Sequence, residues 1–169
     1  RCGPRPHPRS KISQVASPVG EFGDPKIVES ELAASLRSIL ISDFDGTITR
    51  QDFYALVVPR FLERDLPDYW TLYSSGRITH FEAMRSIFSH IRTTEESLRT
   101  TVREMQPDPD LAASVDQLQL RGWEVEVVSA GCRWYIDQIL DAAGVALRVH
   151  ASSGRFSPTG GLLMQLPED

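Results

Sequence analysis

Two aspartates separated by one residue follow an Ile-rich stretch, and their spacing suits nucleophilic and acid–base chemistry. Asp43 and Asp45 flank Phe44, and Gly46 comes next, where the missing Cβ lets the backbone turn sharply. On such a turn both carboxylates can face one ligand, so that one acts as nucleophile and its neighbour as proton donor. Two negative carboxylates this close together are tolerable if a divalent cation lies between them or if one of them is protonated.

Other structures share the Asp-x-Asp-Gly pattern. An EF-hand loop needs a bidentate acid at its twelfth position, and counting from Asp43 that position holds Tyr54, which excludes a calcium loop. A plain polar turn stays open, because Asp and Gly are favoured in turns for their local conformations alone.

A second polar cluster follows another apolar run. Ser129, Ala130 and Gly131 come directly after Val125 to Val128 and precede a predicted helix. A hydroxyl and free backbone N–H groups at a helix N-terminus form a natural anion site, so these residues are candidates for binding phosphate. The alternative is that Ser129 simply caps the helix.

The elements that would position these residues alternate between strands and helices. We expect a helix at 26–37, a buried strand at 38–42, helices throughout 51–121, a strand at 125–129, a helix at 133–143, a strand at 145–150 and a hairpin at 156–166. This order predicts an α/β fold with a Rossmann-like parallel sheet and a helical cap inserted after the first strand. Both polar clusters then lie at the carboxyl ends of strands, where such sheets bind ligands.

The predicted domains are a disordered basic arm at 1–25, a core formed by 26–50 and 122–169, and the helical cap at 51–121. The first twenty residues contain four basic residues, four prolines and no acid. Prolines there remove helix hydrogen bonds, and few apolar groups are available for burial. An organelle transit segment has a similar composition and is the alternative for this arm.

Composition excludes several classes of protein. Hydrophobic residues make up 41% and charged residues 24% of the 169 residues, which excludes a wholly disordered chain. The net charge of −5 argues against a nucleic-acid partner, and no apolar run is long enough to span a membrane. Cys2 and Cys132 lack metal-site spacing, so we expect free thiols in a reducing, cytoplasmic compartment, or in an organelle if the arm is a transit segment.

The string Asp43-Phe44-Asp45-Gly46-Thr47 after an Ile-rich strand resembles the signature of the haloacid-dehalogenase-like phosphatase superfamily. The resemblance implies that Asp43 attacks phosphorus to form an aspartyl-phosphate. Asp45 would protonate the leaving alkoxide and then deprotonate the water that hydrolyses the intermediate. The Asp43 carboxylate and the Asp45 backbone carbonyl would ligate Mg²⁺. The phosphate and substrate would be bound by Gly46, Thr47, Asp52, Ser129, Ala130 and Gly131.

Other motifs of that superfamily are absent from this sequence. The family pattern continues with a lysine and an acidic Gly-Asp-x-x-x-Asp stretch, whereas Lys11 and Lys26, the two lysines of this chain, both precede Asp43. We therefore expect a core that is truncated at its C-terminus. The alternative is a catalytically silent remnant that binds phosphate or a partner.

Within the superfamily the chain resembles the branch that contains phosphoserine phosphatases and a methionine-salvage ketose-phosphate phosphatase. The substrate implied is a small phosphorylated metabolite. Phosphoserine phosphatases have a Glu at the place of Asp52 and a cap Arg at the place of Ile87, although Arg85 is nearby. These departures favour the ketose phosphate as substrate. Asp52 would then hydrogen-bond a substrate hydroxyl; the alternative is that it only begins a solvated helix. Three aromatic residues of the predicted cap are expected either to line a cap pocket or to pack in the core: Trp70, Tyr73 and Phe81.

Overall fold

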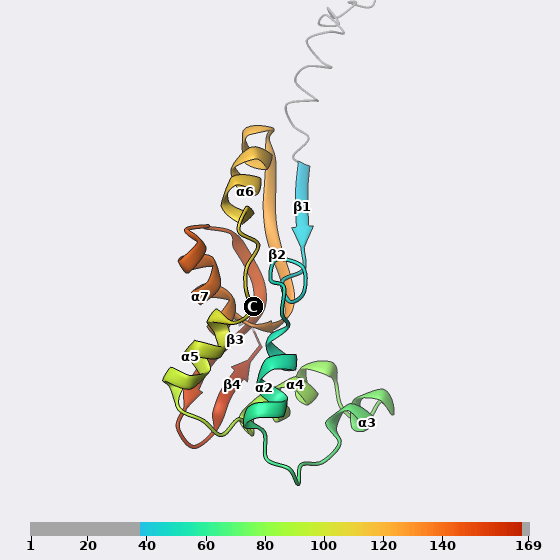
Figure 1. Cartoon of the computed structure of the whole chain (residues 1–169). Helices are drawn as coiled ribbons and strands as arrows, with labels where there is room; N and C mark the ends of the chain where they lie inside the picture. Colours follow the sequence, from blue (N-terminus) through green and yellow to red (C-terminus); the bar gives the residue numbers. More distant parts are fainter. Residues whose placement is uncertain (1–37, 167–169) are drawn as a thin grey trace, which may run out of the picture. The chain divides into compact units, whose positions relative to one another are not determined.

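The computed structural model describes residues 38–166, and the predicted arm at 1–25 and helix at 26–37 lie outside that range. The described elements are β1 (Ser38–Ser42), α2 (Phe53–Phe61), α3 (Tyr69–Ser74), α4 (His80–Ser89), α5 (Glu95–Arg103), α6 (Leu111–Leu120), β2 (Trp123–Cys132), α7 (Arg133–Ala143), β3 (Arg148–Ser157) and β4 (Gly161–Gln165). They alternate as the sequence predicts (Figure 1).

The four described strands form one sheet in the order β1-β2-β3-β4. The first three are parallel, with Leu40 opposite Val125 and Val127 opposite Val149. The last strand runs antiparallel to β3 and completes the predicted hairpin. The expected α/β class with a mostly parallel sheet is therefore confirmed.

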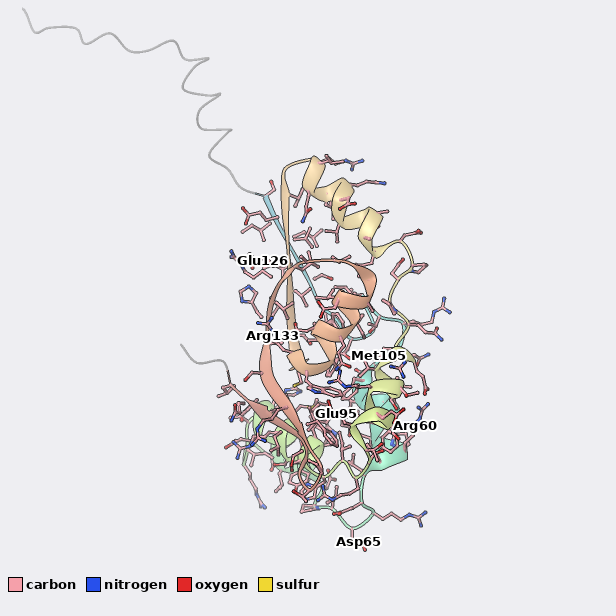
Figure 2. All side chains as sticks on the ribbon, turned by 90° about the vertical axis from the view of Figure 1, so that its left-hand side faces the viewer. Arg60, Asp65, Glu95, Met105, Glu126 and Arg133 are labelled. Carbon is pink, nitrogen blue, oxygen red and sulfur yellow. The ribbon has the colours of Figure 1, made fainter. Side chains whose placement is uncertain are left out.

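Alternation along β2 separates a buried face of the sheet from an exposed one. Val125 and Val127 are buried on the side against which α6 and α7 pack. Glu126, on the other side, binds Arg148 at 3.0 Å and His150 at 2.7 Å (Figure 2). The sheet is thus covered by helices on one face within the described residues.

Strand β1 departs from the prediction of a buried strand. Its Ile39 and Ile41 side chains are 47% and 67% exposed. Their register partners on β2 are Glu124 and Glu126, which places both isoleucines on the uncovered face. An apolar run predicts a strand, but burial depends on what packs against it, and that information is not in the run itself.

The predicted strand at 145–150 is also displaced, because β3 begins only at Arg148 and extends to Ser157. Strand β2 likewise runs beyond its expected end. Cys132 still pairs with Ser152 of β3 across an irregular register, so the strand continues to that residue.

The helices between β1 and β2 confirm the helical pattern predicted for 51–121. Asp52, Thr79 and Thr94 cap α2, α4 and α5 with side-chain hydrogen bonds. Helix α4 packs on β4, while α6 packs on β2. The exact limits of the predicted cap domain stay a prediction.

The core is a continuous apolar cluster in which Phe53 of α2 contacts Phe88 of α4 and stacks on Tyr135 of α7. None of the helices within residues 38–166 is long and apolar enough to cross a bilayer. Cys132 is buried there as a free thiol.

Candidate active site

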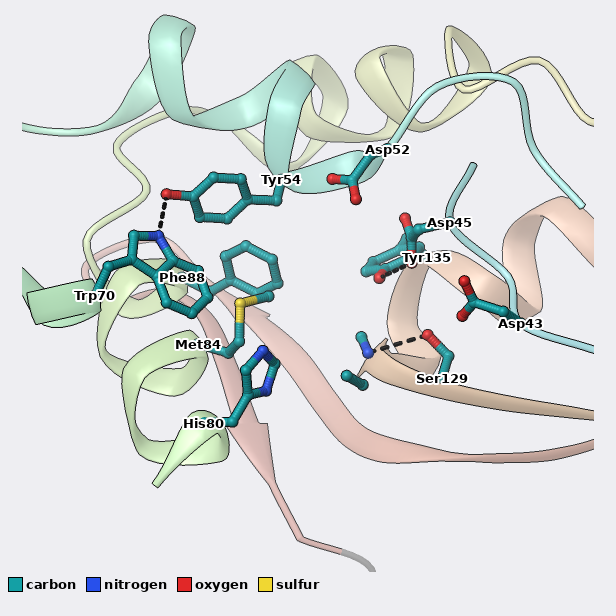
Figure 3. A pocket seen from close by; sticks show the side chains of 12 residues that line it. Asp43, Asp45, Asp52, Tyr54, Trp70, His80, Met84, Phe88, Ser129 and Tyr135 are labelled. Carbon is teal, nitrogen blue, oxygen red and sulfur yellow. Dashed lines mark hydrogen bonds between the residues drawn. The ribbon is translucent and has the colours of Figure 1, made fainter. Parts of the chain in front are cut away.

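A pocket of about 290 Å³ opens where β1 and β2 end, between these strand ends and helices α2 to α4 (Figure 3). Its lining combines the predicted acids and the Ser129 cluster with aromatic and apolar side chains. The lining residues are Asp43, Asp45, Asp52, Tyr54, Trp70, His80, Met84, Phe88, Ser129, Ala130, Gly131 and Tyr135. The structure thus brings together six of the eight residues predicted to form a site.

Asp45 is held firmly in this pocket. Its Oδ1 accepts the backbone N–H of Phe53 at 3.0 Å, and its Oδ2 accepts the hydroxyl of Tyr135 at 2.8 Å. Burial raises the pKa of Asp45 above the usual value of 3.8, the two hydrogen bonds oppose that rise, and the charges of Asp52 and Asp43 add to it. A raised pKa favours the protonated form, which a general acid requires.

Asp43 has the opposite environment. The residue is exposed, and its carboxylate makes no hydrogen bond to any residue within 38–166. Figure 3 shows it pointing into the same space as Asp45 and Ser129. A carboxylate without protein donors keeps its lone pairs available for an electrophile or a cation.

The Ser129 cluster is placed differently from the prediction. Ala130 and Gly131 belong to β2, and α7 begins at Arg133 with Cys132 as its N-cap. The pairing of Cys132 with β3 prolongs the strand and delays the helix. The Gly131 N–H donates to Ser129 Oγ at 3.0 Å, so the hydroxyl proton is left for another acceptor.

Asp52 begins a helix, as one of its two predicted roles requires. It is the N-cap of α2, and its Oδ1 accepts the backbone N–H of Ala55 at 3.0 Å. The residue also lines the pocket, where its second oxygen is available. Capping and substrate binding are therefore compatible for this side chain.

Gly46 and Thr47 lie outside the pocket. Gly46 has φ +76, as a sharp turn requires, and the Thr47 N–H donates to the Phe44 carbonyl at 3.2 Å. Both residues line a separate hollow together with Pro107 to Pro109. The structure gives them a role in shaping the turn.

Sequence reasoning missed several pocket residues. Trp70 was a candidate and does line the pocket, whereas Tyr73 and Phe81 do not. Tyr135, which binds Asp45, has no signal in the sequence that separates it from an ordinary core residue on an apolar helix face. Its hydroxyl can reach Asp45 because Gly131 has no side chain: a Cβ there would lie 1.7 Å from the Tyr135 oxygen.

The donor set suits Mg²⁺ better than a cation that needs a full protein cage. Residues 38–166 contain no cluster of three His, Cys, Asp or Glu side chains positioned for a metal. Mg²⁺ is commonly bound through one or two carboxylates, with water and substrate phosphate completing its shell. The exposed Asp43 carboxylate in the pocket offers such an oxygen ligand.

Comparison with known proteins defines the class. A model of the haloacid dehalogenase-like hydrolase family matches residues 40–167, so the chain belongs to that family. No curated protein matches the sequence.

Solved structures of similar fold include a HAD family hydrolase from Salmonella enterica serovar Typhi (TM-score 0.61, 12% identity, 87% of this chain and 56% of that one). A substrate-bound phosphoserine phosphatase has TM-score 0.57 and 15% identity, with 76% and 63% covered. A phospho-aspartyl intermediate analogue of phosphoserine phosphatase has TM-score 0.51 and 18% identity, with 75% and 60% covered. The chain thus spans 56% to 63% of the length of these structures.

Proposed function

We propose that this protein is a Mg²⁺-dependent phosphomonoester hydrolase that acts through an aspartyl-phosphate on a small phosphorylated metabolite. One observation carries the proposal: the Asp43 carboxylate, which has no hydrogen-bond partner among residues 38–166, lines the same pocket as the Asp45 carboxyl with its raised pKa and the Ser129 hydroxyl. Membership of the hydrolase family supports it.

In the first half-reaction the Ser129 hydroxyl donates to a phosphoryl oxygen and Asp43 attacks phosphorus. A bond forms between an Asp43 oxygen and phosphorus while the bond from phosphorus to the leaving oxygen breaks. Asp45 delivers its proton to that oxygen, so an alcohol departs. The protonated form that burial favours is the form this step consumes.

In the second half-reaction the Asp45 carboxylate takes a proton from water, and the water oxygen bonds to phosphorus. The bond from phosphorus to Asp43 breaks, which regenerates the free carboxylate and releases inorganic phosphate. When bound at Asp43, Mg²⁺ supplies positive charge that offsets the charge on the phosphoryl oxygens.

For the substrate we favour an uncharged, sugar-like alcohol such as the ketose phosphate of methionine salvage over phosphoserine. Ile87, at the place of the cap arginine, is buried in the core. Arg85 lines a different hollow with Tyr69 and Glu82 rather than the pocket. Among the residues that the structure describes, the pocket lining therefore offers no guanidinium to a substrate carboxylate.

The test is hydrolysis of a small phosphomonoester by the full chain in the presence of Mg²⁺. Asp43→Asn is expected to abolish turnover and the phosphoryl adduct that intact-protein mass spectrometry detects after a rapid acid quench. Asp137→Asn, on the exposed side of α7, serves as the matched control. Undiminished hydrolysis by the Asp43 variant would remove the nucleophile assignment.

A phosphate-binding domain without turnover is the second candidate. It is favoured by the absence of lysine from residues 38–166, since both lysines of the chain precede that range. Phosphate binding without a phosphoryl adduct on Asp43 would support this candidate.

A further inference from the structure

The end of the pocket far from Asp43 is built from aromatic and apolar side chains of three helices. Tyr54 comes from α2, Trp70 from α3, and His80, Met84 and Phe88 from α4. Figure 3 shows this group facing the carboxylates across the open space. We call these five residues the apolar wall.

Two residues of the apolar wall fix each other. The Trp70 indole N–H donates to the Tyr54 hydroxyl at 2.6 Å, and the rings meet edge to face with centroids 5.6 Å apart. This bond uses the single polar atom of Trp70, so the indole presents only apolar surface to a ligand. The Tyr54 oxygen is the acceptor, and its own proton stays free to donate.

His80 adds a further ring beside Trp70, with centroids 5.6 Å apart. Its imidazole makes no hydrogen bond to any residue of the described range. Met84 and Phe88 lie one and two turns further along the same helix and are buried. The apolar wall is thus held by packing from several sides, which keeps its shape ready for a ligand.

The charges of the pocket exclude one kind of ligand. Asp43, Asp45 and Asp52 line it, and no Lys or Arg from residues 38–166 does. A divalent cation would supply two positive charges beside these carboxyl groups, which leaves no surplus positive charge for an anionic group besides the phosphate. Bringing a second anion into this partly enclosed space would carry an electrostatic penalty.

We propose that the apolar wall binds the far end of the leaving alcohol, and that this end is an uncharged apolar group. The proposal rests on the proposed function and deepens it. The phosphoryl group lies at the carboxylates, the carbon chain crosses the space between, and the apolar end packs on Trp70 and Met84. The free Tyr54 proton can donate to a hydroxyl on that chain.

The experiment compares kcat/KM for three phosphomonoesters: 2-phenylethyl phosphate, methyl phosphate and 3-phosphoglycerate. We expect the phenylethyl ester to be preferred over phosphoglycerate by at least about tenfold, since apolar pockets discriminate by roughly 10–200-fold. Trp70→Ala should lower kcat/KM for the phenylethyl ester about tenfold, and by a clearly larger factor than for methyl phosphate. Trp123→Ala is the matched control, because Trp123 begins β2 and does not line the pocket.

His80→Arg tests the charge argument by a gain of activity. The added guanidinium should raise kcat/KM for 3-phosphoglycerate and lower the preference for the phenylethyl ester. This outcome requires a folded, active variant, so it keeps the proposal testable if Trp70→Ala fails to fold. Equal kcat/KM for the phenylethyl ester and phosphoglycerate in the unchanged protein would overturn the proposal.

Binding of 2-phenylethanol, measured by broadening of its proton NMR signals, separates this proposal from the catalytic one. Broadening that is lost in Trp70→Ala supports the apolar wall even if none of the esters is hydrolysed, in which case only the catalytic proposal fails. Hydrolysis of all three esters at similar rates, without broadening, would sustain the catalytic proposal and refute the apolar wall.

Discussion

At the residue scale, the site depends on two aspartates that are neighbours in sequence and differ in environment. Asp43 is exposed and accepts no hydrogen bond from the described part of the chain, while Asp45 is held by the Phe53 amide and the Tyr135 hydroxyl. The difference arises because the turn at Gly46 brings Asp45 against the start of α2 and leaves Asp43 at the strand end. Environments that differ in this way let two carboxyls perform different steps of one reaction.

Replacing Asp45 by Asn should stabilise the metal-free protein at neutral pH. The raised pKa means that folding disfavours the charged carboxyl. The contribution of Asp45 to the stability of the fold is therefore complete below its unfolded-state pKa of 3.8, and it is lost as the pH rises through its folded-state pKa. Asparagine removes that cost and can still accept from the Phe53 N–H. We expect Tm at pH 7 to be higher for the variant than for the unaltered protein.

The measurement is thermal unfolding in EDTA at pH 7 and pH 4. The gain of the Asp45 variant should shrink at the lower pH, where the carboxyl is increasingly protonated in both states. Asp116→Asn on the exposed side of α6 should change Tm by little at either pH. A lower Tm for Asp45→Asn at pH 7 would contradict the assigned direction.

Tyr135 is a positioning residue for Asp45. Phenylalanine at position 135 keeps the ring that stacks on Phe53 with centroids 4.2 Å apart but loses the 2.8 Å hydrogen bond to Asp45. A misplaced acid should slow departure of an alkoxide, so kcat for an alkyl phosphate should fall about tenfold, or about 1.4 kcal/mol. A p-nitrophenyl ester needs no proton on its leaving oxygen and should be affected much less.

Tyr73→Phe is the matched control, since Tyr73 is exposed and does not line the pocket. An equal fall for alkyl and aryl esters would show that the Tyr135 hydroxyl does not act through the proton that Asp45 delivers.

At the element scale, the sequence predicts which segments are helices and strands better than where they end. Periodicity identifies α7 correctly, with Gly144 in the left-handed conformation after its last residue. It places the end of β2 too early, because pairing of Cys132 with Ser152 is a contact between segments distant in the chain. The same limit explains why the anion-binding helix start predicted at Ala130 and Gly131 is strand instead.

The cap of α4 connects an element to the site. Thr79 accepts from the Glu82 N–H at 3.2 Å, and Glu82 accepts from the Thr79 N–H at 2.7 Å, which forms a capping box. Thr79→Ala should destabilise the protein by about 1 kcal/mol in urea unfolding. Because His80 and Met84 follow on this helix, KM for the phenylethyl ester should rise as well.

Thr100→Ala, at an exposed position inside α5, is the comparison, and it should cost much less because alanine is the better helix former there. If both variants lost the same stability, the capping box would have no special contribution.

At the scale of the whole molecule, the sequence predicts the α/β class. It also predicts six residues that line one pocket in the structure, because both motifs follow parallel strands. It does not predict the apolar wall, whose members come from α2, α3 and α4 and meet only through packing of those helices. It also cannot tell that Ile39 and Ile41 face an uncovered side of the sheet. Each of these outcomes depends on contacts between segments rather than on local pattern.

The charge balance of the molecule leads to a prediction about Mg²⁺. The chain carries 23 acidic against 18 basic side chains, and three of the acids share one pocket in which no Lys or Arg of the described range takes part. A cation bound only by the folded state stabilises it, by about 2.7 kcal/mol at a hundredfold excess over Kd. Saturating Mg²⁺ should therefore raise Tm by several degrees.

The rise should be lost in Asp43→Asn, which removes the exposed ligand, and kept in Asp141→Asn on the exposed side of α7. Thermal unfolding with and without Mg²⁺ measures this independently of any substrate, and an unchanged Tm in the unaltered protein would show that the two aspartates do not form a magnesium site.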